Sequence, residues 1–266
     1  MSFTLRDFRL ALPLTLVAVL GLATSARAQI TNPSFETGDY TGWNYSGNAS
    51  IETYGSVGEQ PTDGTYQAML QTTNATTGGG TGNSPSTAAA LDTFLGLSGG
   101  TLEAGNFKNG SAITQTFTAT AGQTLKFDAN FLTNEANDGT GNPDQAYAYL
   151  FKGGTLEGSF PLDLGKPTEA TNALSPTDTY WQVGMTGYST FTLNGSYFTS
   201  TGSYTIGFAV LNAATTTINS GLLVDNLSLS TPSAVPLPAG VWAGLLGMGL
   251  TMGVAYRMRR GMHVVA

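Results

Sequence analysis

The side chains between residues 29 and 230 that could do chemistry are mostly carboxylates. Sixteen Asp and Glu residues, all of the chain's seventeen except Asp7, stand there against four lysines and no arginine, which leaves a net charge of −12. The chain has no cysteine, and its single histidine is His263. These absences exclude Ser-His-Asp and Cys-His nucleophile arrangements, His or Cys zinc sites and arginine clamps on phosphate in this segment. Nucleic acid is also excluded as a partner, because phosphate binding depends on clustered Lys and Arg.

Carboxylates leave two kinds of chemistry open. Sixteen of them offer many pairs, so a glycoside hydrolase, which needs two facing carboxylates, remains a distant alternative. The oxygen-rich segment 134–144 could bind Ca²⁺ through Glu135, Asp138 and Asp144, since hard oxygen donors are what this ion prefers. The segment matches no EF-hand spacing, and Asn, Asp and Gly are ordinary turn residues, so a solvated loop is the alternative.

Aromatic side chains offer a third kind of chemistry, because sugars stack on exposed rings. The candidates for sugar binding are Trp43, Tyr45, Tyr180, Trp181 and Tyr188. A tryptophan in a sandwich is usually part of the core, and Tyr180 and Trp181 would point to opposite faces of one strand. We therefore expect one of these two rings to be buried.

Short segments of alternating apolar and polar residues, separated by Gly, Asn and Asp, indicate how these side chains are positioned. The run 87–95, with a serine before it and spaced apolar residues, predicts one short helix. No βαβ rhythm is present, so the pattern predicts an all-β, antiparallel sandwich. The expected strands are 43–54, 65–71, 112–119, 124–132, 145–151, 155–162, 179–193, 203–212 and 221–230.

The N-terminus has the pattern of a secretory signal peptide. Arg6 and Arg9 precede an apolar run over residues 10–22, and small residues flank a cleavage site between Ala28 and Gln29. Residues 1–28 are therefore expected to be removed by signal peptidase. The globular part is expected to span residues 29–230, a comfortable size for one domain.

The C-terminus has three parts in a fixed order. A short motif, residues 235–239, precedes an apolar segment, residues 240–256, and a basic tail, residues 257–266. The uncharged stretch from Ala239 to Tyr256, 18 residues long at about 1.5 Å each, spans about 27 Å, close to the thickness of the hydrocarbon core. The arginines would hold the far end in the cytoplasm. The motif is Val235, Pro236, Leu237, Pro238 and Ala239, and the tail carries Arg257, Arg259 and Arg260.

This tail closely resembles the PEP-CTERM sorting signal in its Val-Pro-Leu-Pro-Ala variant. The resemblance implies recognition and processing by an exosortase, in a bacterium that has an outer membrane and makes extracellular polysaccharide. The protein would pass the inner membrane and reach the cell surface or the medium, with 231–239 as linker and motif. A permanent C-terminal anchor is the alternative.

Three strings stand in order along the body: Asn32-Pro33-Ser34-Phe35-Glu36 followed by Thr41-Gly42-Trp43, then Ile113-Thr114-Gln115-Thr116-Phe117, then Leu222-Leu223-Val224-Asp225-Asn226. Together they resemble carbohydrate-binding-module-like jelly rolls of the galactose-binding-like superfamily. In these relatives the first and last strands lie side by side, and one carboxylate from each binds a structural Ca²⁺. The resemblance thus implies that Glu36 and Asp225 are calcium ligands; the alternative is that Glu36 caps a turn and Asp225 bonds to backbone.

These patterns together predict an exported jelly-roll β-sandwich without catalytic activity. Its expected role is that of a structural component associated with exopolysaccharide or biofilm matrix. A carbohydrate-binding adhesin is the alternative. Possible structural Ca²⁺ is the only cofactor expected, and extracellular polysaccharide is the expected partner besides the processing enzymes.

Overall fold

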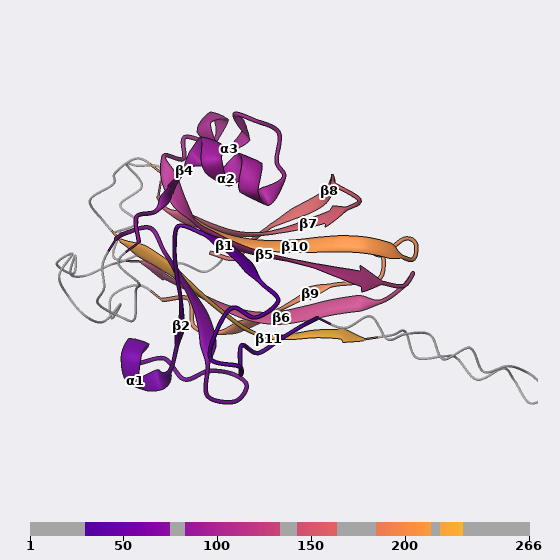
Figure 1. Ribbon diagram of the computed structural model, residues 1–266, viewed down its shortest axis with the longest axis horizontal. Helices are drawn as coiled ribbons and strands as arrows, with labels where there is room; N and C mark the ends of the chain where they lie inside the picture. Colours follow the sequence, from indigo (N-terminus) through magenta and orange to yellow (C-terminus); the bar gives the residue numbers. More distant parts are fainter. Residues whose placement is uncertain (1–29, 75–82, 134–142, 164–184, 214–218, 231–266) are drawn as a thin grey trace, which may run out of the picture.

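Two antiparallel sheets packed face to face form the body of the protein, as the computed structural model shows (Figure 1). The structure describes residues 30–74, 83–133, 143–163, 185–213 and 219–230. The six-stranded sheet has the order β1-β5-β10-β7-β8, with β4 added beside β5, and the five-stranded sheet has the order β2-β3-β11-β6-β9. The predicted antiparallel sandwich is confirmed.

The elements follow the predicted order closely. Their bounds are β1 Asn44–Ser46, β2 Asn48–Glu52, α1 Tyr54–Val57, β3 Gln67–Gln71, β4 Ser86–Thr87, α2 Ala88–Leu95, α3 Thr101–Ala104, β5 Asn109–Ala119, β6 Thr124–Thr133, β7 Gln145–Lys152, β8 Thr155–Pro161, β9 Ser189–Leu193, β10 Gly202–Asn212 and β11 Ser220–Ser230.

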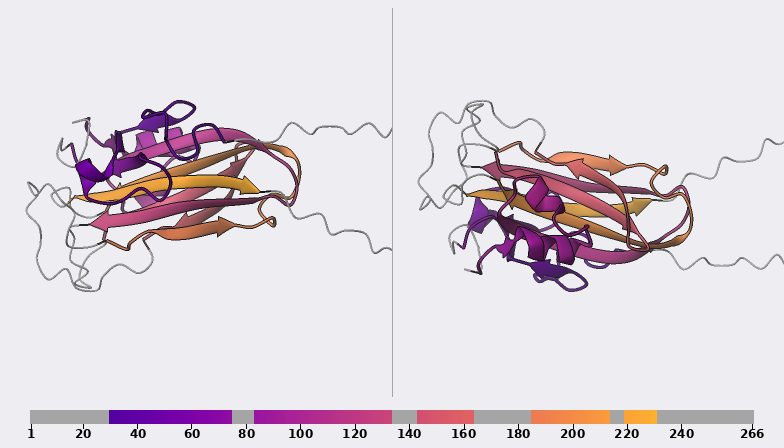
Figure 2. Two further views of the ribbon diagram at one scale, coloured as in Figure 1. Left: turned by 90° about the horizontal axis from the view of Figure 1, so that it is seen from below. Right: turned by 90° about the horizontal axis from the view of Figure 1, so that it is seen from above.

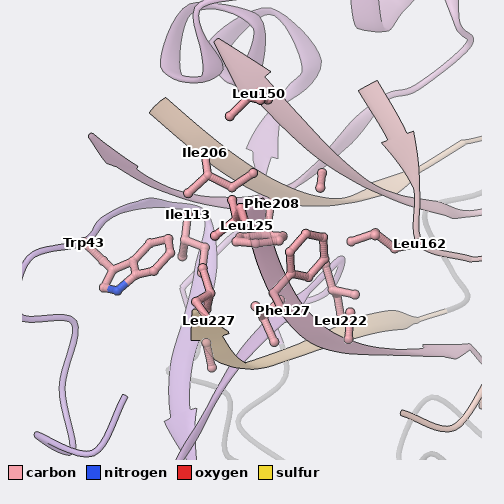
Figure 3. Close-up of a cluster of buried hydrophobic side chains, with 14 of the residues drawn as sticks. Trp43, Ile113, Leu125, Phe127, Leu150, Leu162, Ile206, Phe208, Leu222 and Leu227 are labelled. Atoms are coloured by element: carbon pink, nitrogen blue, oxygen red, sulfur yellow. The ribbon is translucent and has the colours of Figure 1, made fainter. Parts of the chain in front are cut away.

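Alternation along the long strands builds the core between the sheets. In β10, Ile206, Phe208 and Val210 point into this core, whereas Ala209 and Leu211 point to the opposite face. Aromatic rings fill the centre, where Phe127 and Phe208 meet edge to face with centroids 4.8 Å apart (Figure 3). The two inner faces therefore account for most of the buried apolar side chains.

A single glycine turns the first strand from one sheet into the other. β1 pairs with β5 in the six-stranded sheet, and β2, beginning two residues later, pairs with β3 in the five-stranded sheet. Gly47 lies between them with φ of +91°, a conformation that L side chains rarely adopt. A Cβ at this position would lie 2.4 Å from Ser111 Oγ. The continuous strand expected over 43–54 is therefore two short strands around a corner.

Helix α2 covers the outer face of the six-stranded sheet, together with α3 (Figure 2). Its apolar side chains Leu91 and Leu95 pack against Ala209 and Leu211 of β10. The cap is Thr87, whose Oγ1 accepts a hydrogen bond from Ala90 N, and not the serine expected from the sequence. Two further helices of four residues each, α1 and α3, were not expected, because one turn leaves no periodic pattern.

The predicted signal peptide, 1–28, and the predicted span, 240–256, both lie outside the described residues. Within the described part of the chain, no helix has the length and apolar character that crossing a membrane requires. Six of the fifteen residues of the expected strand 179–193 also lie outside. Of the nine described ones, Ser189–Leu193 form β9 and Met185 forms a bridge with Leu132.

Candidate functional site

The segment before β1 contacts β11, the last strand that the structure describes. The first strands lie elsewhere, since β1 belongs to the other sheet and β3 separates β2 from β11. Leu227 N donates to Pro33 O at 3.0 Å, and β11 lies in the middle of its sheet, between β3 and β6. Glu36 and Asp225 therefore approach the same part of the molecule from opposite ends of the sequence. The segment 62–66, which leads into β3, lies against both of them.

The two carboxylates hold this segment, the carboxylate-held turn 62–66, by its main-chain N–H groups. Glu36 Oε1 accepts from Thr65 N and Tyr66 N, both at 2.8 Å. Asp225 Oδ2 accepts from Thr62 N at 2.7 Å, Thr62 Oγ1 at 3.1 Å and Asp63 N at 2.9 Å. Gly64 leaves room for the Glu36 carboxylate, since a Cβ there would lie 2.2 Å from its Cδ. Two side chains distant in sequence thus fix one turn.

Asp225 is buried, and burial shifts its ionisation. The side chain has no exposed surface, and this burial raises the pKa of Asp225 to about 6 even though hydrogen bonds to Asp63, Asn226 and Thr62 favour the charged form. Its second oxygen, Oδ1, accepts from Asn226 N at 2.7 Å. Asn226 adopts a left-handed conformation with φ of +54° at the bulge between Asp225 and Ser228.

This geometry matches the alternative in which the carboxylates serve the backbone. Three donors already contact Asp225 Oδ2, and two contact Glu36 Oε1, so the turn is held without a metal ion. Among the described residues, no group of three His, Cys, Asp or Glu side chains is placed to hold a metal. The calcium ion at Glu36 and Asp225 stays a prediction.

Asp128 and Asp225 are two neighbouring carboxylates, as an acid and base couple would require. They are direct cross-strand partners in β6 and β11. Both oxygens of Asp128 are engaged, Oδ1 by Thr190 Oγ1 at 2.5 Å and Oδ2 by Asn226 Nδ2 at 2.9 Å. Both oxygens of Asp225 are engaged as well. The pair therefore organises the bulge through hydrogen bonds to neighbouring side chains and backbone.

The face of the five-stranded sheet that points away from the core carries amide, carboxylate and apolar side chains together. We call it the outer polar face, formed by Glu52 of β2, Gln67, Met69 and Gln71 of β3, Leu223 and Asp225 of β11, and Asp128, Asn130 and Leu132 of β6. Strand register brings these residues into cross-strand rows, for example Met69 beside Leu223 and Leu223 beside Asn130. Met69, Leu132 and Leu223 form a small apolar cluster with Val57.

Tyr188 packs on this cluster. Its hydroxyl donates to Gln67 Oε1, and its ring contacts the cluster beside Met185. Burial raises the pKa of the Tyr188 hydroxyl well above its usual value, and the charges of Asp225, Glu59 and Asp128 raise it further. Of the three selected aromatic residues that the structure describes, Trp43, Tyr45 and Tyr188, the last is thus the one that lies over a polar sheet face.

Two amides on the outer polar face have unpaired atoms. Among the residues that the structure describes, neither Nε2 nor Oε1 of Gln71 has a hydrogen-bond partner, and Nδ2 of Asn130 has none. Both side chains are fully buried, and they lie on the two strands that flank β11. A buried amide without a partner costs about 1–3 kcal/mol of folding free energy. Such groups are usually paired, so these two mark a place where a polar ligand would be stabilised.

Sequence reasoning missed Gln71 and Asn130, because a lone amide in a strand gives no signal before its neighbours are known. It also placed Trp43 among the sugar-binding candidates. Trp43 is only 6 % exposed and packs between Phe35 and Phe208, so its ring belongs to the core (Figure 3).

The remaining sequence-predicted residues are scattered. Tyr45 is 51 % exposed in β1 of the six-stranded sheet, beside the ring of Tyr40, whereas Tyr188 packs on the five-stranded sheet. Asp144 is buried at the start of β7, and its Oδ1 accepts from Ala213 N at 3.0 Å. Four predicted residues lie outside the described part of the chain: Glu135, Asp138, Tyr180 and Trp181.

No protein-family model matches this chain, and no curated protein matches it in sequence. The similar solved structures include carbohydrate-binding modules with a β-sandwich fold. One is TmCBM61 in complex with β-1,4-galactotriose, at 13 % identity over 78 % of this chain and 100 % of that one, with a TM-score of 0.42. Another is CBM28, a module specific for non-crystalline cellulose, at 12 % identity over 77 % and 96 %, with a TM-score of 0.38.

The K2 cleaved adhesin domain of Lys-gingipain is similar as well, at 11 % identity over 75 % of this chain and 97 % of that domain, with a TM-score of 0.39. At TM-scores below 0.5 and identities below 25 %, these similarities say nothing of the ligand.

Proposed function

We propose that this protein is an exported, non-catalytic carbohydrate-binding protein and that the outer polar face binds the sugar. The observation that carries the proposal is the pair of buried amides with unpaired atoms, Gln71 and Asn130, on either side of β11. Sugar hydroxyls both donate and accept hydrogen bonds, so they match an amide that offers both kinds of group. Apolar Met69 and Leu223, together with the Tyr188 ring, supply the surface on which a pyranose face packs.

Tyr188 controls access in this proposal. Because its ring packs on the apolar cluster and its hydroxyl bonds to Gln67, the sugar reaches Gln71 and Asn130 when the ring turns away. The bound sugar then takes over the contact with Gln67. Sugar binding is compatible with the expected role in the extracellular matrix, since a matrix protein that holds polysaccharide needs a surface that binds it.

The test is a glycan array of neutral and uronic-acid oligosaccharides, followed by titration calorimetry with any glycan that binds. Gln71→Leu and Asn130→Leu are expected to weaken binding about tenfold each, since each removes hydrogen bonds of about 0.5–1.5 kcal/mol. Folding of Gln71→Leu should be unchanged or slightly favoured, because an unpaired buried amide is replaced by an apolar group of similar size. Asn130→Leu also removes the acceptor of a 3.4 Å hydrogen bond from Thr186 Oγ1, so its stability is measured beside its binding. This separates lost binding from lost structure.

Thr205→Val is the matched control, because Thr205 pairs with Thr116 on the outer face of the other sheet. It should bind as the unchanged protein does. The proposal would be contradicted if no glycan on the array bound, or if both leucine variants bound as tightly as the unchanged protein.

We further propose that the C-terminal tail sorts the protein and is removed. The support is the order of Pro236-Leu237-Pro238, the apolar segment 240–256 and the three terminal arginines, which fits a processing signal for an exosortase better than a permanent anchor. Intact-mass measurement on protein from its native host is expected to give a chain that begins at Gln29 and lacks the arginines. Full-length tail in the inner membrane would mean an anchor instead.

A further inference from the structure

The space between the two sheets ends in polar side chains where β5 and β7 begin and β10 ends. Val210, Leu222 and Phe131 belong to the core, and residues two positions along a strand point to the same side. This alternation of side chains directs six polar residues toward the space between the sheets. We call these six residues the polar end row. It consists of Asn109, Asp144 and Asn212 from the six-stranded sheet and Thr72, Thr133 and Ser220 from the five-stranded sheet.

The three residues from the six-stranded sheet lie in one line across it. Asn109 and Asn212 are direct partners in the pairing of β5 with β10. The register of β10 with β7 pairs Leu211 with Gln145, and one further step places Asp144 opposite Asn212. The hydrogen bond from Ala213 N to Asp144 Oδ1, at 3.0 Å, holds the carboxylate there. Two amides and one carboxylate thus lie side by side.

The two halves of the polar end row differ in how their polar atoms are paired. Thr133 Oγ1 bonds to Ser220 Oγ at 2.8 Å, and Ser220 N donates to Thr72 Oγ1 at 2.9 Å. In contrast, neither Oδ1 nor Nδ2 of Asn212 has a hydrogen-bond partner in the described part of the chain, although this side chain has no exposed surface. Oδ1 of Asn109 has no partner there either. Burying such a group without a hydrogen-bond partner destabilises the folded protein, unless a ligand supplies the missing interaction.

We propose that the polar end row binds a hard cation of the Ca²⁺ type, with Asp144, Asn109 and Asn212 as side-chain ligands. Carboxylate and amide oxygens are the donors that such ions prefer. The buried Asp144 contributes negative charge, and the side chain of Asn212 can turn to present Oδ1, since its two amide atoms are interchangeable in shape. The net charge of −12 on residues 29–230 attracts cations to the whole domain.

This site is separate from the calcium site that the sequence predicts at Glu36 and Asp225. Those carboxylates hold the turn 62–66, and Asp225 lies on the outer polar face of the five-stranded sheet. Asp144 was also a candidate ligand from sequence, together with Glu135 and Asp138 of its loop. Here its partners are asparagines from two other strands, which no sequence pattern links to it.

Calcium titration of the purified full chain by calorimetry tests the proposal, with Asp144→Asn and Asn212→Leu as variants. Each variant should bind one ion fewer than the unchanged protein or bind it at least tenfold more weakly. Glu36→Gln is the matched control, because it removes a carboxylate from the other candidate site, and it should leave this binding event unchanged. The proposal would be overturned if Glu36→Gln no longer bound calcium while Asp144→Asn bound it as the unchanged protein does.

Melting curves in EDTA and in millimolar calcium give a second readout that misfolding would not imitate. The unchanged protein should melt several degrees higher with calcium, because an ion bound only to the folded state stabilises it. Asn212→Leu should melt as high as the unchanged protein, or higher, in EDTA, and should lose the rise with calcium. Superimposable curves for the unchanged protein would mean that water fills the row, and the proposal would be wrong.

Discussion

Asp225 is a buried carboxylate that accepts hydrogen bonds from three residues and joins the last strand to the turn before β3. Thr62 and Asp63 lie more than 160 positions from it in sequence, so these bonds tie together segments that local contacts would leave independent. Burial and hydrogen bonding act on its ionisation in opposite directions, and burial is the larger effect. The charged form is therefore less favourable in the folded protein than in the unfolded chain.

This difference predicts how stability depends on pH in metal-free protein. The pKa of Asp225 rises from 3.8 to about 6 on folding, so the folded state binds the proton more tightly. The stabilisation is fully present below about pH 4 and is lost as the pH rises through 6, by at most about 3 kcal/mol. Urea unfolding in EDTA at pH 4 to 7 should show the unchanged protein losing stability relative to Asp225→Asn. A constant difference between the two would contradict this.

The sequence indicated part of the candidate site and missed the rest for a physical reason. Glu36 and Asp225 were selected through a resemblance, and they do meet at one turn. Tyr188 was selected as an aromatic and does lie over a polar face. Gln71 and Asn130 could not be found, because their importance comes from missing partners, and partners are known only when strands are paired. The selection of Trp43 for sugar binding was wrong, because alternation along a strand does not tell which of its two faces is buried.

Among the elements, the corner between β1 and β2 depends most on one residue. Gly47→Ala would place a Cβ 2.4 Å from Ser111 Oγ and 2.8 Å from Gly110 O, in a conformation with φ of +91°. We expect it to destabilise the protein by about 1–3 kcal/mol, since a strained backbone alone costs that much. Gly99→Ala is the control, because the Cβ that this substitution adds would have no neighbouring atom within 4 Å. Chemical denaturation of both variants is the measurement, and equal stability would contradict the role of the corner.

The strands could be predicted where apolar and polar residues alternate over many consecutive positions. The expected 203–212 and 221–230 differ from β10 and β11 by one residue at one end. The corner at Gly47 was missed because the apolar pattern continues through it while the partner strand changes. The cap of α2 was misplaced by one residue, since Ser86 and Thr87 are both good caps and the Ser86 hydroxyl is instead hydrogen-bonded to the Ser46 hydroxyl.

The whole molecule carries a large negative charge, which limits the polysaccharides it can hold. With −12 on residues 29–230, acidic polymers are repelled unless a cation bridges them. We expect binding of a uronic-acid polysaccharide to require calcium and to weaken as sodium chloride is added, whereas binding of a neutral polysaccharide should change little. Titration calorimetry with and without EDTA measures both. Strong binding of the acidic polymer in EDTA would contradict the expectation.

The position of β11 has a mechanical consequence. It is the last strand that the structure describes, yet it lies between β3 and β6, pairing with β6 over most of its length and with β3 at residues 221–224. Tension applied at the C-terminus would therefore load two ladders of hydrogen bonds in shear, together with the bonds from Asp225 to Thr62 and Asp63. An edge strand would instead peel away one bond at a time. A domain tethered through this end should resist pulling, with a slow forced-unfolding rate.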